Sequence, residues 1–197
     1  MDNITPESVE ITAGAYISIA VLNKIKKTIQ SKDKVISLVM GGGSGKTHLA
    51  KIFNELYTDE SFYFLDLEGV FDTDSKIPKV VKDELAKLKK SDAILYHARV
   101  LKLYKELLNE LLPRLRSLNK KIVVLVSNRD TAKYLKLKRV YLAPDRKLYK
   151  EQFEKSKNQN YLTYCRQSLK SKKAILFKDY DDLLSKIQEI FGISDKL

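Results

Sequence analysis

Four of the seven glycines of this 197-residue chain lie in one short stretch of sequence. The stretch reads "VISLVMGGGSGKTHLAKIF" and covers residues 35–53. Its glycines are Gly41, Gly42, Gly43 and Gly45. Glycine allows positive φ angles, so successive backbone N–H groups can turn toward one point, and a helix that begins there adds its dipole. Residues 41–45, the glycine loop, therefore predict a site where backbone N–H groups bind phosphate.

Lys46 and Thr47 follow the glycine loop and supply the side chains that such a site needs. We expect Lys46 to reach the β- and γ-phosphates of a nucleotide and the Thr47 hydroxyl to hold Mg²⁺. Ser44 is expected to bind the nucleotide as part of the loop. His48, the next residue after Thr47, is also counted among the expected nucleotide-binding residues, although the favoured interpretation is that His48 lies on the surface of the helix. The expected cofactors are ATP and Mg²⁺.

The flanks of the loop decide between a phosphate site and a plain glycine-rich turn. An apolar run over residues 35–40 predicts a buried strand, and the spacing of Leu49, Ile52, Phe53 and Leu56 predicts a helix. This order is the context that the pattern G-x-x-x-x-G-K-[ST] requires. The chain has Met40 where the pattern has its first glycine. The turn must then be made by Met40 or taken over by Gly41.

These features resemble the P-loop NTPases and, within them, the small nucleoside, nucleotide and shikimate-type kinases. The resemblance in motif covers Val35 to Gly69 and extends in element order to the end of the chain. Such kinases carry carboxylates at the end of the strand after the loop helix, and here "FLDLEG" places Asp66 and Glu68 there. Strand alternation would point both toward the ligand-binding edge of the sheet. The resemblance implies that Asp66 holds Mg²⁺ or acts as the catalytic base and that Glu68 holds the acceptor; acids in an ordinary turn are the alternative.

Four arginines are candidates for contact with phosphates or substrate. In the kinases that the chain resembles, a strand such as "RVYLAP" leads to a helix and a lid whose arginines clamp phosphate, which implies this role for Arg146 and a catalytic role for Arg166. Arg129 follows another predicted strand, and Arg99 lies in the helical stretch on the acceptor side. Guanidinium groups suit phosphoryl oxygens. A surface or salt-bridge role is the alternative for each of them.

Strands and helices are predicted to alternate through the chain. Strands are expected at residues 35–40, 61–69, 120–128, 139–144 and 172–177. The remaining segments include an N-terminal helix within residues 1–30, a helical acceptor-side segment at 70–118 and a lid-like region at 146–170. The pattern predicts a single α/β domain over residues 1–197, doubly wound, with a mostly parallel sheet and helices on both faces.

The composition restricts the partners. The chain carries 37 Lys and Arg against 25 Asp and Glu, a net charge of +12, which leaves nucleic acid possible as a partner. Most of these cations are lysines, however, and lysines are typical of solvated helix faces. No apolar run is long enough to span a membrane, and the first residues lack a basic signal region, so we expect a cytoplasmic protein without a membrane partner. Cys165 is alone and is given no role.

The favoured function is ATP- and Mg²⁺-dependent phosphoryl transfer to a small acceptor, a nucleoside or a nucleotide. One alternative is an ATP-dependent protein acting on nucleic acid, either a polynucleotide kinase or a packaging-type ATPase. Another is a protein that binds nucleotide without turnover. The strand ending "VVLVSNRD" lacks the adjacent carboxylate pair of motor ATPases, which favours a kinase. The oligomeric state is left open.

Overall fold

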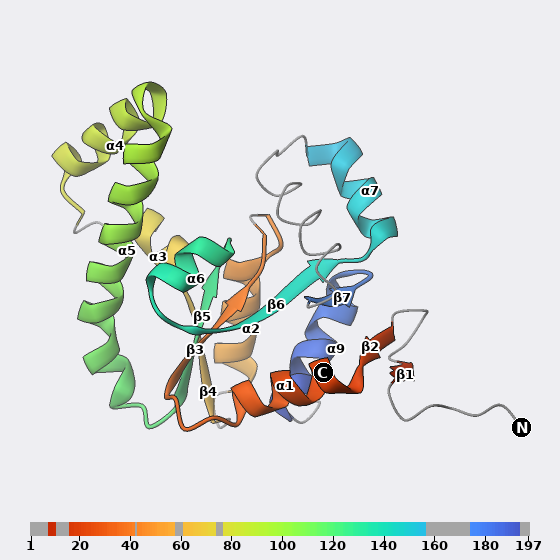
Figure 1. The fold of residues 1–197 in the computed structure, drawn as a ribbon. Helices are drawn as coiled ribbons and strands as arrows, with labels where there is room; N and C mark the ends of the chain where they lie inside the picture. The colour runs from red at the N-terminus through yellow and green to blue at the C-terminus, as the bar shows by residue number, and fades with distance from the viewer. Residues whose placement is uncertain are drawn as a thin grey trace, which may run out of the picture.

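A five-stranded parallel sheet forms the centre of the computed structural model (Figure 1). The structure describes residues 8–10, 16–41, 43–57, 61–73, 77–156 and 174–193. The strands of this sheet are β3 (Val35–Val39), β4 (Phe62–Asp66), β5 (Lys121–Val126), β6 (Lys138–Pro144) and β7 (Ala174–Phe177). All four pairings between neighbouring strands are parallel. The predicted α/β fold with a parallel sheet is confirmed.

The strand order is β4-β5-β3-β6-β7, so the chain starts in the middle of the sheet. From β3 it passes to the edge strand β4 and returns to β5 beside β3. It then crosses to β6 and β7 on the other side. In open α/β sheets, ligands bind outside the carboxyl ends of the strands where the strand order reverses. That place lies at the end of β3, where the glycine loop begins.

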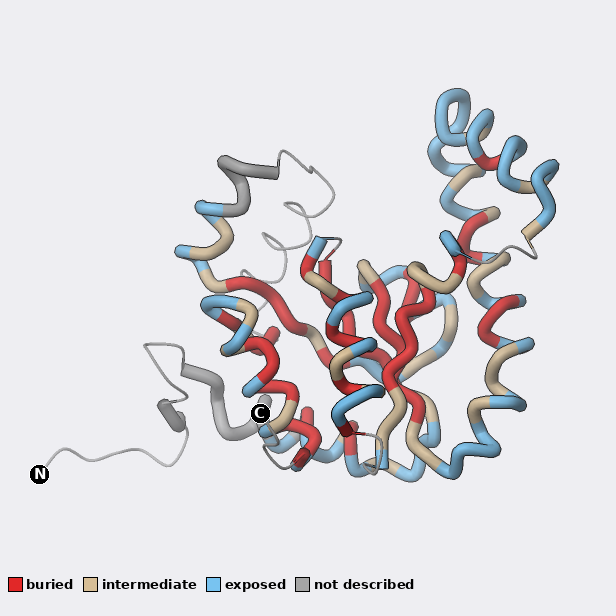
Figure 2. Tube along the Cα trace, turned by 180° about the vertical axis from the view of Figure 1, so that it is seen from behind, coloured by how far each residue is buried: buried red, intermediate tan, exposed pale blue. Residues whose placement is uncertain are grey.

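Helices cover both faces of the sheet because alternate strand residues point to opposite sides. Leu38 packs in a core with α1 (Ile19–Ile29), α2 (Lys46–Leu56) and α9 (Tyr180–Phe191). Its neighbour Val39 packs in a second core with α3 (Leu67–Thr73), α5 (Ala93–Arg116) and α6 (Arg129–Tyr134). The strands are buried between these layers (Figure 2). Helices on both faces agree with the predicted doubly wound arrangement.

Two helices lie largely outside these layers. Helix α4 (Lys79–Ser91) packs against α5 and buries only Leu85 among its residues, and this pair extends beyond the sheet (Figures 1 and 2). The side chain of Asp92 caps α5 by accepting hydrogen bonds from the N–H groups of Ile94 and Leu95. Helix α7 (Arg146–Ser156) follows β6. Within the described ranges, no helix has both the length and the hydropathy to cross a membrane.

The N-terminal prediction was wrong in its first half. A helix was expected within residues 1–30, but α1 begins only at Ile19. Before it, β1 (Ser8–Glu10) and β2 (Tyr16–Ser18) pair in antiparallel fashion, with Val9 opposite Ile17. β-Branched and aromatic residues such as these favour strands, which explains why the helical interpretation failed here.

Candidate active site

The glycine loop connects the buried strand β3 to α2. Met40 is fully buried, and its N–H donates to the Val126 carbonyl at 2.9 Å, so Met40 extends the pairing with β5. The Gly41 carbonyl accepts hydrogen bonds from the Ser44 N–H at 3.2 Å and from the Ser44 hydroxyl at 2.6 Å. The turn therefore starts at Gly41, which resolves the alternative that the sequence left open.

Two glycines of the loop have the positive φ angles that glycine permits. Gly43 has φ of +83° and Gly45 has φ of +81°. Gly45 is the N-cap of α2, and a Cβ atom there would lie 2.9 Å from Cε2 of Tyr180. The loop conformation therefore requires glycine at these positions. Gly42 lies outside the described residues.

Lys46 lies in the first turn of α2 and is only 8% exposed. Its Nζ donates to the Ser127 hydroxyl at 2.8 Å and lies 3.3 Å from Glu68 Oε2. Glu68 in turn accepts hydrogen bonds from the Ser127 N–H at 2.7 Å and from the Ser127 hydroxyl. One cation, one hydroxyl and one carboxylate therefore form a connected group at the end of β5.

Thr47 and Asp66 form a second contact beside the first. The Thr47 hydroxyl donates to Asp66 Oδ2 at 2.5 Å, and the Gly69 N–H donates to Asp66 Oδ1 at 3.1 Å. Asp66 ends β4, is 7% exposed, and lies opposite Leu125 of β5. Hydroxyl and carboxylate oxygens are ligands that Mg²⁺ accepts, and Mg²⁺ usually takes only one or two protein ligands. The pair fits the metal that the sequence predicts.

Glu68 reaches this group from a helix and not from the strand that was expected. β4 ends at Asp66, and α3 begins at Leu67, so Glu68 lies in the first turn of α3. Leu67 is fully buried and directs this turn into the core. Strand alternation is therefore not what brings Asp66 and Glu68 together, although the two carboxylates do lie near Lys46 and Thr47.

The side of the site formed by α3 and α5 is acidic. Asp72 is exposed, but partial desolvation raises its pKa, and the nearby carboxylates of Glu68 and Asp66 raise it further. Burial likewise raises the pKa of Tyr104 on α5, with the charges of Glu68 and Asp72 adding to the effect. The rings of Tyr104 and Phe71 meet edge to face at 5.0 Å, which ties the two helices together here. Three carboxylates, those of Asp66, Glu68 and Asp72, therefore lie near Lys46.

The predicted arginines do not join this group among the described residues. Arg99 Nε lies 3.4 Å from Glu84 Oε1, which links α5 to α4. Arg129 is 70% exposed and lies 3.8 Å from Asp130. Arg146 is the exposed first residue of α7. Arg166 lies outside the described residues, so its catalytic role stays a prediction.

His48 lies on the exposed face of α2, as the favoured interpretation had it. Its ring stacks on Tyr180 with 5.4 Å between centroids. Tyr180 also lies against Gly45, and burial raises the pKa of its hydroxyl. Neither Tyr180 nor Ser127 was predicted from the sequence. Ser127 could have been found from its place after the apolar run 121–126, because the ends of parallel strands meet at one edge.

A cavity of about 340 Å³ lies at the opposite edge of the sheet. Its lining includes Ser61 just before β4, Phe62 at the start of β4 and Lys121 at the start of β5. The Lys121 ammonium donates to the carbonyls of Ile29 and Ser31. Because ligands of parallel α/β sheets bind at the carboxyl ends of the strands, this cavity is not the candidate active site.

The fold was compared with known proteins. Among solved structures, it is similar to the crystal structure of shikimate kinase from Aquifex aeolicus vf5, with 19% sequence identity and a TM-score of 0.44. The match covers 80% of this chain and 96% of that chain. No family model matches the sequence, and the search of curated proteins gave no match.

Proposed function

We propose that this protein transfers the γ-phosphoryl group of ATP to a hydroxyl group of a small acceptor. The observation that carries the proposal is the convergence of Lys46, Thr47, Asp66 and Glu68 directly beside the glycine loop. The loop N–H groups and Lys46 would bind the phosphates. Thr47 and Asp66 would hold Mg²⁺, which neutralises charge on the phosphate oxygens.

The carboxylates supply what the acceptor needs. In the transfer, the acceptor oxygen bonds to the γ-phosphorus while the bond from that phosphorus to the leaving oxygen of ADP breaks. The proton of the acceptor hydroxyl passes to a carboxylate, for which Asp66 and Glu68 are the two candidates. Asp66 already accepts hydrogen bonds from Thr47 and Gly69, which suits it to the metal. Glu68 is then the carboxylate that orients the acceptor hydroxyl. The general base is the one of these two carboxylates that accepts the proton from this hydroxyl.

The acidic surroundings favour an uncharged acceptor, so a nucleoside fits this proposal better than a nucleotide. Asp66, Glu68 and Asp72 lie close enough to one another to raise the pKa of Asp72 together with burial. Lys46 and Lys82 offset part of this effect on the pKa. A phosphate on the acceptor would meet these carboxylates, and like charges repel.

The test is a screen of phosphoryl acceptors with ATP and Mg²⁺, measured as ADP release. Lys46→Ala should abolish turnover. Because this change also leaves the carboxylate of Glu68 without its cation, we expect a lower melting temperature, and a thermal melt checks that the variant is still folded at the assay temperature. Asp66→Asn should lower kcat by about 100-fold or more, the scale of a general base. Asp83→Asn removes an exposed carboxylate on α4 and should leave turnover unchanged. Wild-type turnover in Lys46→Ala would contradict the proposal, and so would ATP binding without transfer to any acceptor.

A further inference from the structure

Lys46 contacts a carboxylate in the structure, although the proposed function needs its charge at a phosphate. Its Nζ lies 3.3 Å from Glu68 Oε2, and its side chain is only 8% exposed. A buried ammonium must be paired with an anion or shift its pKa, because desolvation penalises an isolated charge. Glu68 supplies the required negative charge.

Ser127 fixes this ion pair through three hydrogen bonds. Its hydroxyl accepts from Lys46 Nζ at 2.8 Å and donates to Glu68 Oε2. Its N–H donates to Glu68 Oε1 at 2.7 Å. Both carboxylate oxygens of Glu68 therefore take part in contacts that hold the group at Lys46 and Ser127 while the pair persists.

We propose that Glu68 competes with nucleotide phosphate for Lys46, and that Ser127 is the positioning residue that holds Glu68 in this competing position. The inference rests on the proposed function, since it concerns the same phosphate site. A phosphate that binds Lys46 displaces Glu68, whose carboxylate then becomes available to the acceptor. Nucleotide binding thereby prepares the acceptor side of the site.

The competition lowers phosphate affinity by a predictable route. A ligand that binds only one of two arrangements has an apparent affinity reduced by the fraction of molecules in that arrangement. If the pair leaves Lys46 available in about one molecule in ten, removing the competing charge should tighten binding about tenfold. A merely structural role for Glu68 or Ser127 would leave affinity unchanged or weaken it.

The experiment measures the Kd of Mg²⁺–ATP and of inorganic tripolyphosphate by titration calorimetry with the full chain. Glu68→Gln keeps the size and the bond from the Ser127 N–H but removes the charge, so both ligands should bind about tenfold more tightly. Ser127→Ala removes the two hydroxyl contacts and should tighten binding by a smaller factor. Glu106→Gln removes a carboxylate that pairs with Lys102 on α5 and should change neither Kd.

The outcomes separate this inference from the proposed function. Unchanged or weaker binding in Glu68→Gln, with normal binding in the wild type, overturns the inference and leaves the nucleotide site intact. If a thermal melt shows that Glu68→Gln does not fold, the test rests on Ser127→Ala. Unchanged or weaker binding of both ligands by Ser127→Ala then overturns the inference. If the wild type binds neither ligand, the proposed function itself is overturned, and the inference with it.

Discussion

Gly43 and Gly45 have the same backbone conformation but different surroundings. Their φ angles are +83° and +81°. A Cβ atom on Gly43 would meet nothing within 4 Å, whereas one on Gly45 would lie 2.9 Å from the Tyr180 ring. The two residues therefore separate the cost of a left-handed backbone from the cost of a steric clash.

We predict that Gly45→Ala destabilises the protein more than Gly43→Ala does. Both substitutions should lose about 1–2 kcal/mol of unfolding free energy because alanine disfavours this conformation. Gly45→Ala should lose about 1–3 kcal/mol more, because the methyl group forces Tyr180 to move. Urea denaturation of both variants gives the comparison. Equal losses would mean that the Tyr180 ring yields without cost.

At the scale of elements, one side chain of α2 pairs with the backbone of one residue on the open edge of β4. β4 is an edge strand of the sheet, so its outer N–H and C=O groups lack a neighbouring strand. The Asn54 amide donates to the Phe64 carbonyl at 2.7 Å and accepts from the Phe64 N–H at 2.9 Å. Asn54 therefore imitates a strand neighbour and holds β4 close to α2.

Removal of this amide should destabilise β4, which ends in Asp66. Asn54→Ala leaves both backbone groups of the buried Phe64 without these partners, and we expect a loss of about 1–3 kcal/mol in unfolding free energy. Asn109→Ala removes an exposed amide on α5 and serves as the control, with little change expected. Denaturation of both variants tests this, and equal stability of the two would argue against a role for Asn54 at the edge.

Helix α3 carries a charge whose effect on stability depends on pH. Partial desolvation, with Glu68 and Asp66 nearby, raises the pKa of the exposed Asp72 in the folded protein above its unfolded value of about 3.9. The folded state then binds the proton more tightly, so the stability gained is fully present below the unfolded pKa and is lost as pH rises through the folded pKa. At pH near 7, the ionised carboxylate therefore lowers stability.

Asp72→Asn should raise the melting temperature at about pH 7, since the amide carries no charge. The difference from the wild type should disappear below about pH 3.9, where the wild-type carboxyl is also neutral in the unfolded chain. Calorimetric melts across this range provide the measurement, with Asp83→Asn on α4 as the comparison. A lower melting temperature of Asp72→Asn near neutral pH would contradict the expected destabilisation by the ionised carboxylate.

At the scale of the whole molecule, the sequence predicted the strands and the loop better than their arrangement. Buried parallel strands read as continuous apolar runs, and the glycine spacing before Lys46 is specific. The strand order cannot be read from local periodicity, yet it is this order that puts β5 beside β3 and Ser127 beside Lys46. Helix α3 was missed because the alternation from Asp66 to Glu68 also fits a strand.

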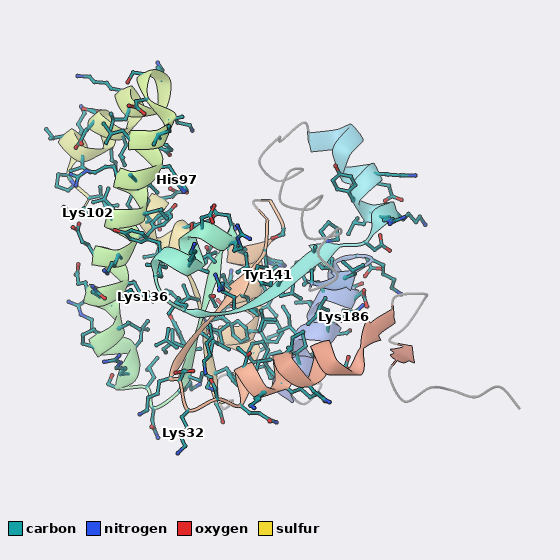
Figure 3. All side chains as sticks on the ribbon, in the orientation of Figure 1. Lys32, His97, Lys102, Lys136, Tyr141 and Lys186 are labelled. Carbon is teal, nitrogen blue, oxygen red and sulfur yellow. The ribbon has the colours of Figure 1, made fainter. Side chains whose placement is uncertain are left out.

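Basic side chains lie on several different elements of the part of the chain that the structure describes. Figure 3 shows Lys32, Lys102 and Lys136 on separate parts of the chain. Several lysines also lie beside acids, as Lys138 does at 2.6 Å from Asp33 and Lys102 at 3.9 Å from Glu106. Recognition of nucleic acid usually needs basic residues gathered on one face. We therefore expect the net charge of +12 to give a weak, unspecific attraction to phosphates.

We predict that single-stranded DNA binds weakly and does not stimulate ATP turnover. Binding should weaken steeply between about 50 and 200 mM salt, because such attraction depends on counterion release. Fluorescence anisotropy of a labelled oligonucleotide measures it. The charge reversals Lys32→Glu and Lys136→Glu should weaken binding by similar small factors, since each changes only one of many dispersed charged side chains. One variant losing most of the binding, or turnover that rises with DNA at about 200 mM salt, would instead support the nucleic-acid-acting alternative, because a defined site resists screening better than a diffuse field.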